Sequence, residues 1–309
     1  MNNLKTHINN YLEYCQYQKR LDAKSLKAYR IDLAQFEMSC SSIDIFEIAS
    51  SDKLEIYIAA LHQKYQPKTV KRKIASVKAF FHYLEYKDII IYNPFNKMQI
   101  KFREPTILPK TISLHTIELL LSTMYMQHSL ANTSFQKKKT LRDIAVVELL
   151  FSTGMRISEV CSLKPSDINL NDKIILVHGK RSKERKIQLC NNDVISSLKK
   201  YQYYFNHEIE KSRFFFVNQR GNMLSEQSVR EMLNKYTKIA NIPQHITPHM
   251  FRHTFATVLL EEDVDIRYIQ EMLGHSSINV TEIYTHVAMA KQKSILKSKH
   301  PRKNLNIIK

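Results

Sequence analysis

Apolar residues in the first third of the chain recur every three or four positions, which is the spacing of helices that bury one face. The pattern predicts four amphipathic helices, over residues 5–19, 23–38, 51–65 and 67–87. Basic residues crowd the first half of the fourth helix, at Lys68, Lys71, Arg72, Lys73 and Lys78. Such a helix can lie in a DNA groove with its cations on phosphates, although a solvated lysine-rich face would give the same pattern.

The regular spacing ends at Asn93, where a proline follows and disfavours further helix. Residues 94–112 contain more prolines and no sustained apolar period, so we predict an extended linker there. A chain of 309 residues is long enough to bury two cores. We therefore predict two domains, a helical one over residues 1–93 and a second one over residues 113–309.

The second predicted domain mixes helical patterns with two short β-rich runs. Helices are predicted over residues 113–126, over a buried stretch that ends at Gly154, and over residues 191–206 and 225–240, with a loop over residues 127–139. Two β-rich runs around a basic turn at Gly179 predict a hairpin over residues 173–190, and residues 213–218 are predicted to form a short strand. The whole chain is therefore predicted to be mainly α-helical with a small β-hairpin or sheet.

A charged pair follows Gly154. Arg156 stands at the head of a short predicted helix, and Glu159 lies one turn later, near enough to hold the guanidinium in place. An ordinary surface ion pair is the alternative interpretation, and it would add little stability.

A second arginine stands near the start of another predicted helix. Thr247 can cap this helix and the proline after it suits the first helical position, so His249 falls in the first turn. Helical spacing places His249 and Arg252 on one face, which we expect to be turned toward a surface or cleft, away from the apolar face with Phe251. A helix start favours an anion, and arginine fits phosphate oxygens. Because no glutamate follows the first of the spaced histidines, His249 and His253, we predict no metal site.

The composition favours a polyanionic partner. The formal net charge is +18, and no apolar run is long enough to span a bilayer, so nucleic acid is favoured over a membrane surface. The N-terminus has no apolar signal segment, and the four cysteines form no closely spaced pair. We therefore expect a cytoplasmic protein without membrane partners.

The candidate side chains favour metal-independent phosphoryl transfer. They include no cluster of carboxylates of the kind that holds magnesium in two-metal nucleases. Such transfer needs cations on the non-bridging oxygens, which Arg156 and Arg252 can supply, and a nucleophile, for which Tyr284 is suited. It also needs an acid for the leaving oxygen, for which we favour Lys180. His249 can accept the proton of the tyrosine.

Four segments, TGMRISEV, VHGKRSKERKIQL, HMFRHTFATVLLE and LGHSSINVTEIYTHV, resemble the motif boxes of the tyrosine recombinase (phage integrase) family, and most closely its Xer-like members. The first domain resembles the SAM-like core-binding domain of that family, notably at TVKRKIASVKAFFHYL. Carried over by position, the resemblance implies a catalytic set of Arg156, Lys180, His249, Arg252, His275 and Tyr284. Lys183 lies on the same turn as Lys180 and is the alternative acid.

The resemblance implies a site-specific DNA recombinase. The tyrosine would attack a phosphodiester, form a 3′-phosphotyrosyl link and free a 5′-hydroxyl, with no cofactor and no metal. The implied partners are double-stranded DNA at specific recombination sites, further copies of the chain in a tetramer on two duplexes, and possible accessory proteins. Integration or excision of a mobile element and dimer resolution are all compatible. A type IB-like topoisomerase and an inactive sequence-specific DNA-binding protein are the alternatives.

Overall fold

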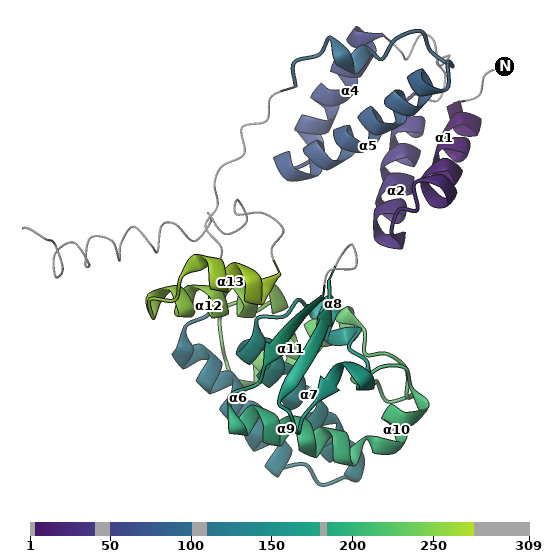
Figure 1. Cartoon of the computed structure of the whole chain (residues 1–309). Helices are drawn as coiled ribbons and strands as arrows, with labels where there is room; N and C mark the ends of the chain where they lie inside the picture. The colour runs from purple at the N-terminus through teal and green to yellow at the C-terminus, as the bar shows by residue number, and fades with distance from the viewer. Residues whose placement is uncertain (1–3, 41–49, 101–109, 180–183, 275–309) are drawn as a thin grey trace, which may run out of the picture. The chain divides into compact units, whose positions relative to one another are not determined.

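The computed structural model of the chain describes residues 4–40, 50–100, 110–179 and 184–274. The chain divides into two compact units, residues 1–107 and 108–309 (Figure 1). Helices dominate both units, and the described residues contain one small antiparallel sheet, which confirms the predicted fold class. No helix within these ranges is long and apolar enough to cross a bilayer.

The first unit contains the four predicted helices. They are α1 (Leu4–Glu13), continued by the π-helical turn η1 (Tyr14–Gln18), then α2 (Ala23–Ser39), α4 (Ser51–Lys64) and α5 (Pro67–Tyr86). Asp22 caps the start of α2, because its carboxylate accepts a hydrogen bond from the Ser25 amide at 2.9 Å. Phe36 of α2 and Phe81 of α5 are buried and meet edge to face, with ring centroids 6.0 Å apart.

Packing of the first unit continues beyond α5. A short 3₁₀ helix, η2 (Pro94–Asn96), follows it, and both Pro94 and Phe95 are buried. The Phe95 ring lies 5.6 Å from that of Phe81, so it completes the same aromatic core. The first residues of the stretch predicted as a linker are therefore folded against α5.

The basic half of α5 is less available to DNA than its sequence indicates. Lys73 is only 2% exposed, and its ammonium donates hydrogen bonds to Asp32 of α2 at 3.1 Å and to Gln35. Arg72 also pairs with Asp32, and the Ser76 hydroxyl donates to the same carboxylate at 2.9 Å. The interpretation of Lys73 as a phosphate contact is wrong, because this buried lysine holds a buried carboxylate.

The second unit is built around one buried helix, α7 (Ser134–Thr153), which packs against α6 (Leu114–Ser129), α9 (Asn192–Tyr204) and α12 (Pro248–Glu261). The remaining helices are α8 (Ile157–Cys161), the 3₁₀ turn η3 (Pro165–Asp167), α10 (Asn206–Lys211), α11 (Glu226–Ile239) and α13 (Ile266–Leu273). The Thr133 hydroxyl caps α7 by accepting from the Gln136 amide at 3.1 Å. The predicted loop over residues 127–139 is therefore shorter, because this cap starts the helix at Ser134.

The predicted hairpin is confirmed. Strands β2 (Ile174–His178) and β3 (Glu184–Gln188) pair in antiparallel register, with Val177 opposite Arg185, and a short strand β1 (Ile168–Asn169) pairs with β2. Within β3, Arg185 and Ile187 are half-buried while their neighbours are exposed. Arg185 therefore lies on the face of the hairpin that packs against the rest of the unit.

The short strand predicted over residues 213–218 is wrong. The segment is bent, and only Val217 forms an isolated bridge, with Met223. The buried Tyr201 hydroxyl donates to the Phe215 carbonyl at 2.9 Å and accepts from the Val217 amide at 3.0 Å. One side chain thus satisfies backbone groups that a neighbouring strand would otherwise pair.

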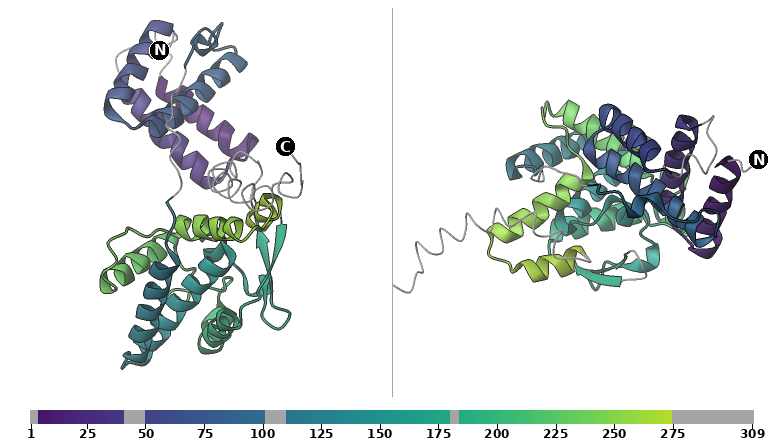
Figure 2. Two further views of the ribbon diagram at one scale, coloured as in Figure 1. Left: turned by 90° about the vertical axis from the view of Figure 1, so that its left-hand side faces the viewer. Right: turned by 90° about the horizontal axis from the view of Figure 1, so that it is seen from above.

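α12 and α13 lie side by side in the second unit, and α13 packs against β3 of the hairpin (Figure 2). Ala256 of α12 packs with Ile269 and Leu273 of α13 in a small core. α12 begins at Pro248 as predicted, but the Thr247 side chain makes no capping hydrogen bond. The proline, which needs no hydrogen-bond partner for its nitrogen, starts the helix without that cap.

Candidate active site

The structure describes three of the predicted site residues, Arg156, His249 and Arg252, all in the second unit. The other predicted site residues, Lys180 with its alternative Lys183, His275 and Tyr284, lie outside the described residues. Two of the described residues, Arg156 and Arg252, bind the backbone at Leu273 and Gly274, directly before His275.

A glycine turn brings the segments of this group together. α7 ends at Gly154, whose φ of +59° lies in the left-handed region that favours glycine. A Cβ atom at this position would lie 2.7 Å from the Phe255 ring and 2.8 Å from the Leu273 side chain. The absence of a side chain therefore lets α12 and α13 pack against the end of α7, and the buried helix ends at Gly154 as predicted.

Arg156 is the residue that precedes α8, and Glu159 in the first turn holds it twice. The Arg156 guanidinium donates to Glu159 Oε1 at 2.8 Å, and its backbone amide donates to Oε2 at 2.9 Å. The predicted contact is confirmed, but the surface-pair alternative is wrong because the Glu159 side chain is almost completely buried. The guanidinium also donates from Nη2 to the Gly274 carbonyl at 3.3 Å.

Arg252 is buried, with 5% of its surface exposed, which corrects the expectation that it faces a surface or open cleft. Its Nη1 donates to the Gly154 carbonyl at 2.8 Å, and its Nη2 donates to the Leu273 carbonyl at 2.7 Å. These carbonyls lie at the ends of α7 and α13, where backbone oxygens lack helical partners. Because both acceptors are neutral, they fix the guanidinium without cancelling its charge.

Sequence reasoning missed the role of Arg185. This β3 residue donates from Nε to the Met272 carbonyl at 2.8 Å, and from Nη1 and Nη2 to the two oxygens of Glu159 at 3.1 and 2.8 Å. A signal was available, because alternation along β3 places Arg185 on the same face as the apolar Ile187. In the sequence it is one basic residue among several near a turn.

Three consecutive carbonyls at the end of α13 are each bound by a different arginine. Met272 accepts from Arg185, Leu273 from Arg252 and Gly274 from Arg156. The C-terminal end of a helix carries partial negative charge, so cations are favoured there. Three guanidinium groups and one carboxylate, Glu159, leave this cluster with a net positive charge immediately before His275.

Glu159 stays ionised within the arginine cluster. Burial alone would raise the pKa of this carboxyl group, but hydrogen bonds from Arg185 and Arg156 outweigh burial and hold its pKa below the ordinary value. The carboxylate therefore works as a fixed anion that orients two guanidinium groups.

His249 lies in the first turn of α12, as predicted, and its side chain reaches solvent. Loss of part of its hydration lowers its pKa below the ordinary value of 6.5, and the charges of Arg252, Arg230 and Arg156 lower it further. His249 lines a hollow with Lys110, His245 and His253. The neutral imidazole favoured here can accept a proton.

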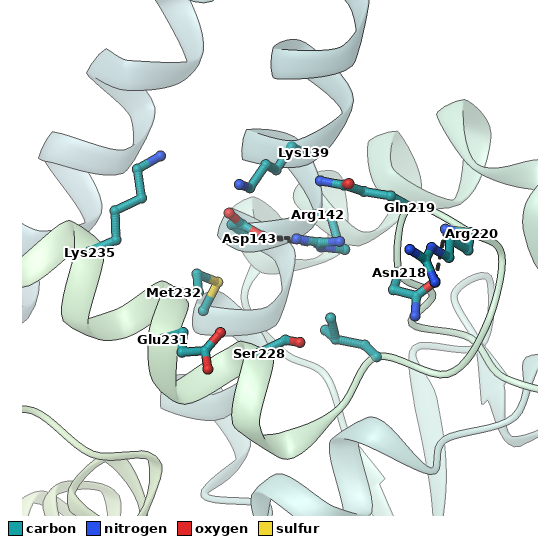
Figure 3. Close-up of a pocket in the computed structure, with 11 residues that line it drawn as sticks. Lys139, Arg142, Asp143, Asn218, Gln219, Arg220, Ser228, Glu231, Met232 and Lys235 are labelled. Carbon is teal, nitrogen blue, oxygen red and sulfur yellow. Dashed lines mark hydrogen bonds and ion pairs between the residues drawn. The ribbon is translucent and has the colours of Figure 1, made fainter.

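Figure 3 shows a different pocket in the second unit, of about 470 Å³, and none of the predicted site residues lines it. Its wall includes the buried pair of Arg142 and Asp143, joined by a 2.7 Å contact, and the cations Lys139, Arg220 and Lys235. Asp143 also accepts from the Tyr236 hydroxyl at 3.3 Å. These contacts tie α7 to α11, so we assign the pair a structural role and not a catalytic one.

Within the described ranges, no group of three or more histidine, cysteine or acidic side chains is placed to hold a metal ion. The described site instead offers fixed guanidinium groups and a histidine that favours its neutral form. Such groups bind the oxygens of a phosphate and accept a proton from an attacking group.

Residues 124–291 match the phage integrase family, and residues 8–87 match the phage integrase N-terminal SAM-like domain. The chain is 63% identical over 306 residues to a tyrosine recombinase of Agathobacter rectalis, covering 99% of this chain and 100% of the relative. It is 33% identical to tyrosine recombinase XerC of Bacillus subtilis, with 98% of each chain covered.

The fold is similar to that of solved DNA complexes. XerH site-specific recombinase bound to palindromic difH substrate in a post-cleavage complex matches with a TM-score of 0.71 and 22% identity, over 93% of this chain and 83% of that one. A lambda integrase tetramer bound to a Holliday junction matches with a TM-score of 0.68 and 16% identity, over 89% of this chain and 77% of that one.

Proposed function

Because the chain belongs to the phage integrase family, and is therefore a site-specific recombinase that transfers DNA strands, we propose that Tyr284 attacks the scissile phosphate while Arg156 and Arg252 stabilise the charge that develops on it. The observation that carries the proposal is the arginine cluster on carbonyls 272–274, directly before His275. Fixed cations next to the second predicted histidine are what a metal-independent phosphoryl transfer needs.

In the first step, the Tyr284 oxygen forms a bond to phosphorus and the bond from phosphorus to the 5′-oxygen breaks. The proton of the tyrosine passes to His249, whose lowered pKa keeps it neutral and able to accept. Lys180, or Lys183 on the same turn, gives a proton to the departing 5′-oxygen. The product is a 3′-phosphotyrosyl link, and a 5′-hydroxyl of a second strand reverses the step.

We further propose that residues 1–93 and 113–309 are a DNA-binding domain and a catalytic domain. Three of the basic residues of α5, Lys68, Lys71 and Lys78, are exposed and suited to phosphate contacts. The lambda integrase neighbour is a tetramer on a Holliday junction, and this relative supports a tetramer on two duplexes for this chain as well. A cytoplasmic location stays a prediction.

The test begins with duplexes that the full-length chain selects from a random pool. A selected duplex with a nick near the cleavage point should trap a covalent adduct with the wild-type chain in the presence of EDTA. Tyr284→Phe should bind this duplex equally well and form no adduct. An adduct that persists in Tyr284→Phe would refute the assignment of the nucleophile.

A further inference from the structure

We infer that Arg185 is a positioning residue of the recombination site, which shares the charge of Glu159 so that the group around Arg156 keeps a net positive charge toward the phosphate. The inference rests on the proposed role of Arg156. Arg185 is not expected to touch the DNA itself, because all three of its guanidinium nitrogens donate hydrogen bonds within the protein, to Met272 and Glu159.

Two arginines donate hydrogen bonds to the Glu159 carboxylate, Arg185 and Arg156. Arg185 meets the carboxylate with both terminal nitrogens, one on each oxygen, in the parallel arrangement that makes arginine pairs strong and specific. Arg156 reaches the same carboxylate with one guanidinium nitrogen and its backbone amide. The carboxylate is thus bound more fully by the side chain of Arg185 than by that of Arg156.

This arrangement decides the charge that a phosphate would meet. If Glu159 faced Arg156 alone, one buried anion would offset one cation at hydrogen-bond distance, where charges interact strongly. With Arg185 on both oxygens, two cations share one anion, and the group keeps a net positive charge. If Arg185 were removed, the Glu159 carboxylate would offset the charge of Arg156 alone, and the positive electrostatic potential at the phosphate would weaken.

Arg185 also joins two segments that carry predicted catalytic residues. It lies on β3, directly after the basic turn with Lys180, and its Nε holds the Met272 carbonyl. Gly274 has a φ of +65°, and a Cβ atom there would lie 3.0 Å from the Arg185 guanidinium. Gly274, the residue before His275, therefore packs directly against the Arg185 side chain.

A purely structural role is the competing explanation, in which Arg185 only fastens the hairpin to α13. The two explanations differ in how Arg185 and Glu159 depend on each other. If Arg185 acts by sharing the charge of Glu159, its removal matters mainly while Glu159 is charged. If it only fastens the hairpin, its removal costs the same whether residue 159 is charged or neutral.

The experiment measures single-turnover cleavage of the nicked selected duplex by the full-length chain. We expect Arg185→Gln to slow cleavage at least ~10-fold relative to Arg213→Gln, while both variants bind DNA within about threefold of wild type. Arg213 is an exposed arginine of the same unit, so its substitution removes the same charge without touching Glu159. In a Glu159→Gln background, Arg185→Gln should cost less than about threefold.

Equal costs of Arg185→Gln in both backgrounds would overturn the inference, as would a wild-type cleavage rate for Arg185→Gln. Arg185→Lys keeps the charge but loses the two-point contact, so it should cleave at a rate between wild type and Arg185→Gln. If Arg185→Gln has lost the native circular dichroism spectrum, Arg185→Lys takes its place in the comparison between the two backgrounds. Failure of the wild-type chain to form any adduct would instead count against the proposed function.

Discussion

Arg252 in α12 and Leu273 at the end of α13 are joined by a hydrogen bond of 2.7 Å from Nη2 to the backbone carbonyl, across 21 residues of sequence. The same guanidinium holds the Gly154 carbonyl at 2.8 Å. One buried cation thus fixes the ends of two helices, and its position depends on having two donors at the right spacing.

Replacement of Arg252 by lysine keeps the charge but cannot reproduce this spacing. An ammonium group on a flexible chain cannot hold both carbonyls in the geometry of a planar fork. We expect Arg252→Lys to lower single-turnover cleavage by ~100-fold or more, with DNA affinity changed far less. Comparison of the cleavage rate at saturating protein with the dissociation constant checks this expectation, and a near-wild-type rate would contradict it.

The pH dependence of cleavage should report His249. Its folded pKa lies below 6.5, so it is neutral at neutral pH, and the rate should fall as pH drops through the folded pKa. Arg230 is one of the charges that lower this pKa, and Glu226 raises it. Arg230→Gln should therefore move the acid limb of the rate profile to higher pH, and Glu226→Gln should move it to lower pH.

Single-turnover rates measured from acid to neutral pH on the nicked duplex test this assignment. His249→Ala should lose the acid limb as well as most of the rate. Profiles of Arg230→Gln and Glu226→Gln that shift in the same direction would exclude His249 as the group that titrates.

Substitution of Gly154 and of Gly221 by alanine should lower the stability of the fold by different amounts. Both have positive φ, +59° and +73°, but a Cβ atom at Gly221 has no neighbour within 4 Å, whereas at Gly154 it meets Phe255 and Leu273. Gly221→Ala should cost about 1 kcal/mol from backbone conformation alone. Gly154→Ala should cost ~1–3 kcal/mol more from overpacking. Shifts of the denaturant midpoint decide this, and equal shifts would show that the contacts at Gly154 relax freely.

The choice between Lys180 and Lys183 can be made with a substrate whose bridging 5′-oxygen is sulfur. A thiolate leaves without a proton, so loss of the general acid should matter little on this substrate. Lys180→Ala should cleave the ordinary duplex very slowly and recover most of its rate on the sulfur substrate. If Lys183→Ala is rescued and Lys180→Ala is not, the role belongs to Lys183.

Much of the fold could be predicted from the sequence because periodic apolar residues determine which helix faces are buried. α5 and the β2–β3 hairpin follow their patterns closely, and α7 ends at Gly154 as predicted. The strand expected at residues 213–218 does not form, because the Tyr201 hydroxyl makes the hydrogen bonds of the Phe215 carbonyl and the Val217 amide. Patterns local to a segment cannot reveal such a partner.

The charged residues were harder to predict. Lys73 was grouped with the basic residues that could contact phosphates, and Arg252 was expected to face a surface or cleft. Both are buried on partners from other segments. For Arg252 and Arg185 the partners include backbone carbonyls, which every residue has and which leave no signature in a sequence. The residue types of the site could be found by motif, but the network that places them could not.

The central claim is that the arginine cluster supplies positive charge to the scissile phosphate, and a charge-neutral phosphate tests it most directly. On the ordinary selected duplex, Arg156→Gln should cleave ~100-fold or more slowly than wild type. On the same duplex with a methylphosphonate at the scissile position, one negative oxygen is absent, and the difference between Arg156→Gln and wild type should shrink to about tenfold or less. An undiminished difference on the methylphosphonate would contradict the account.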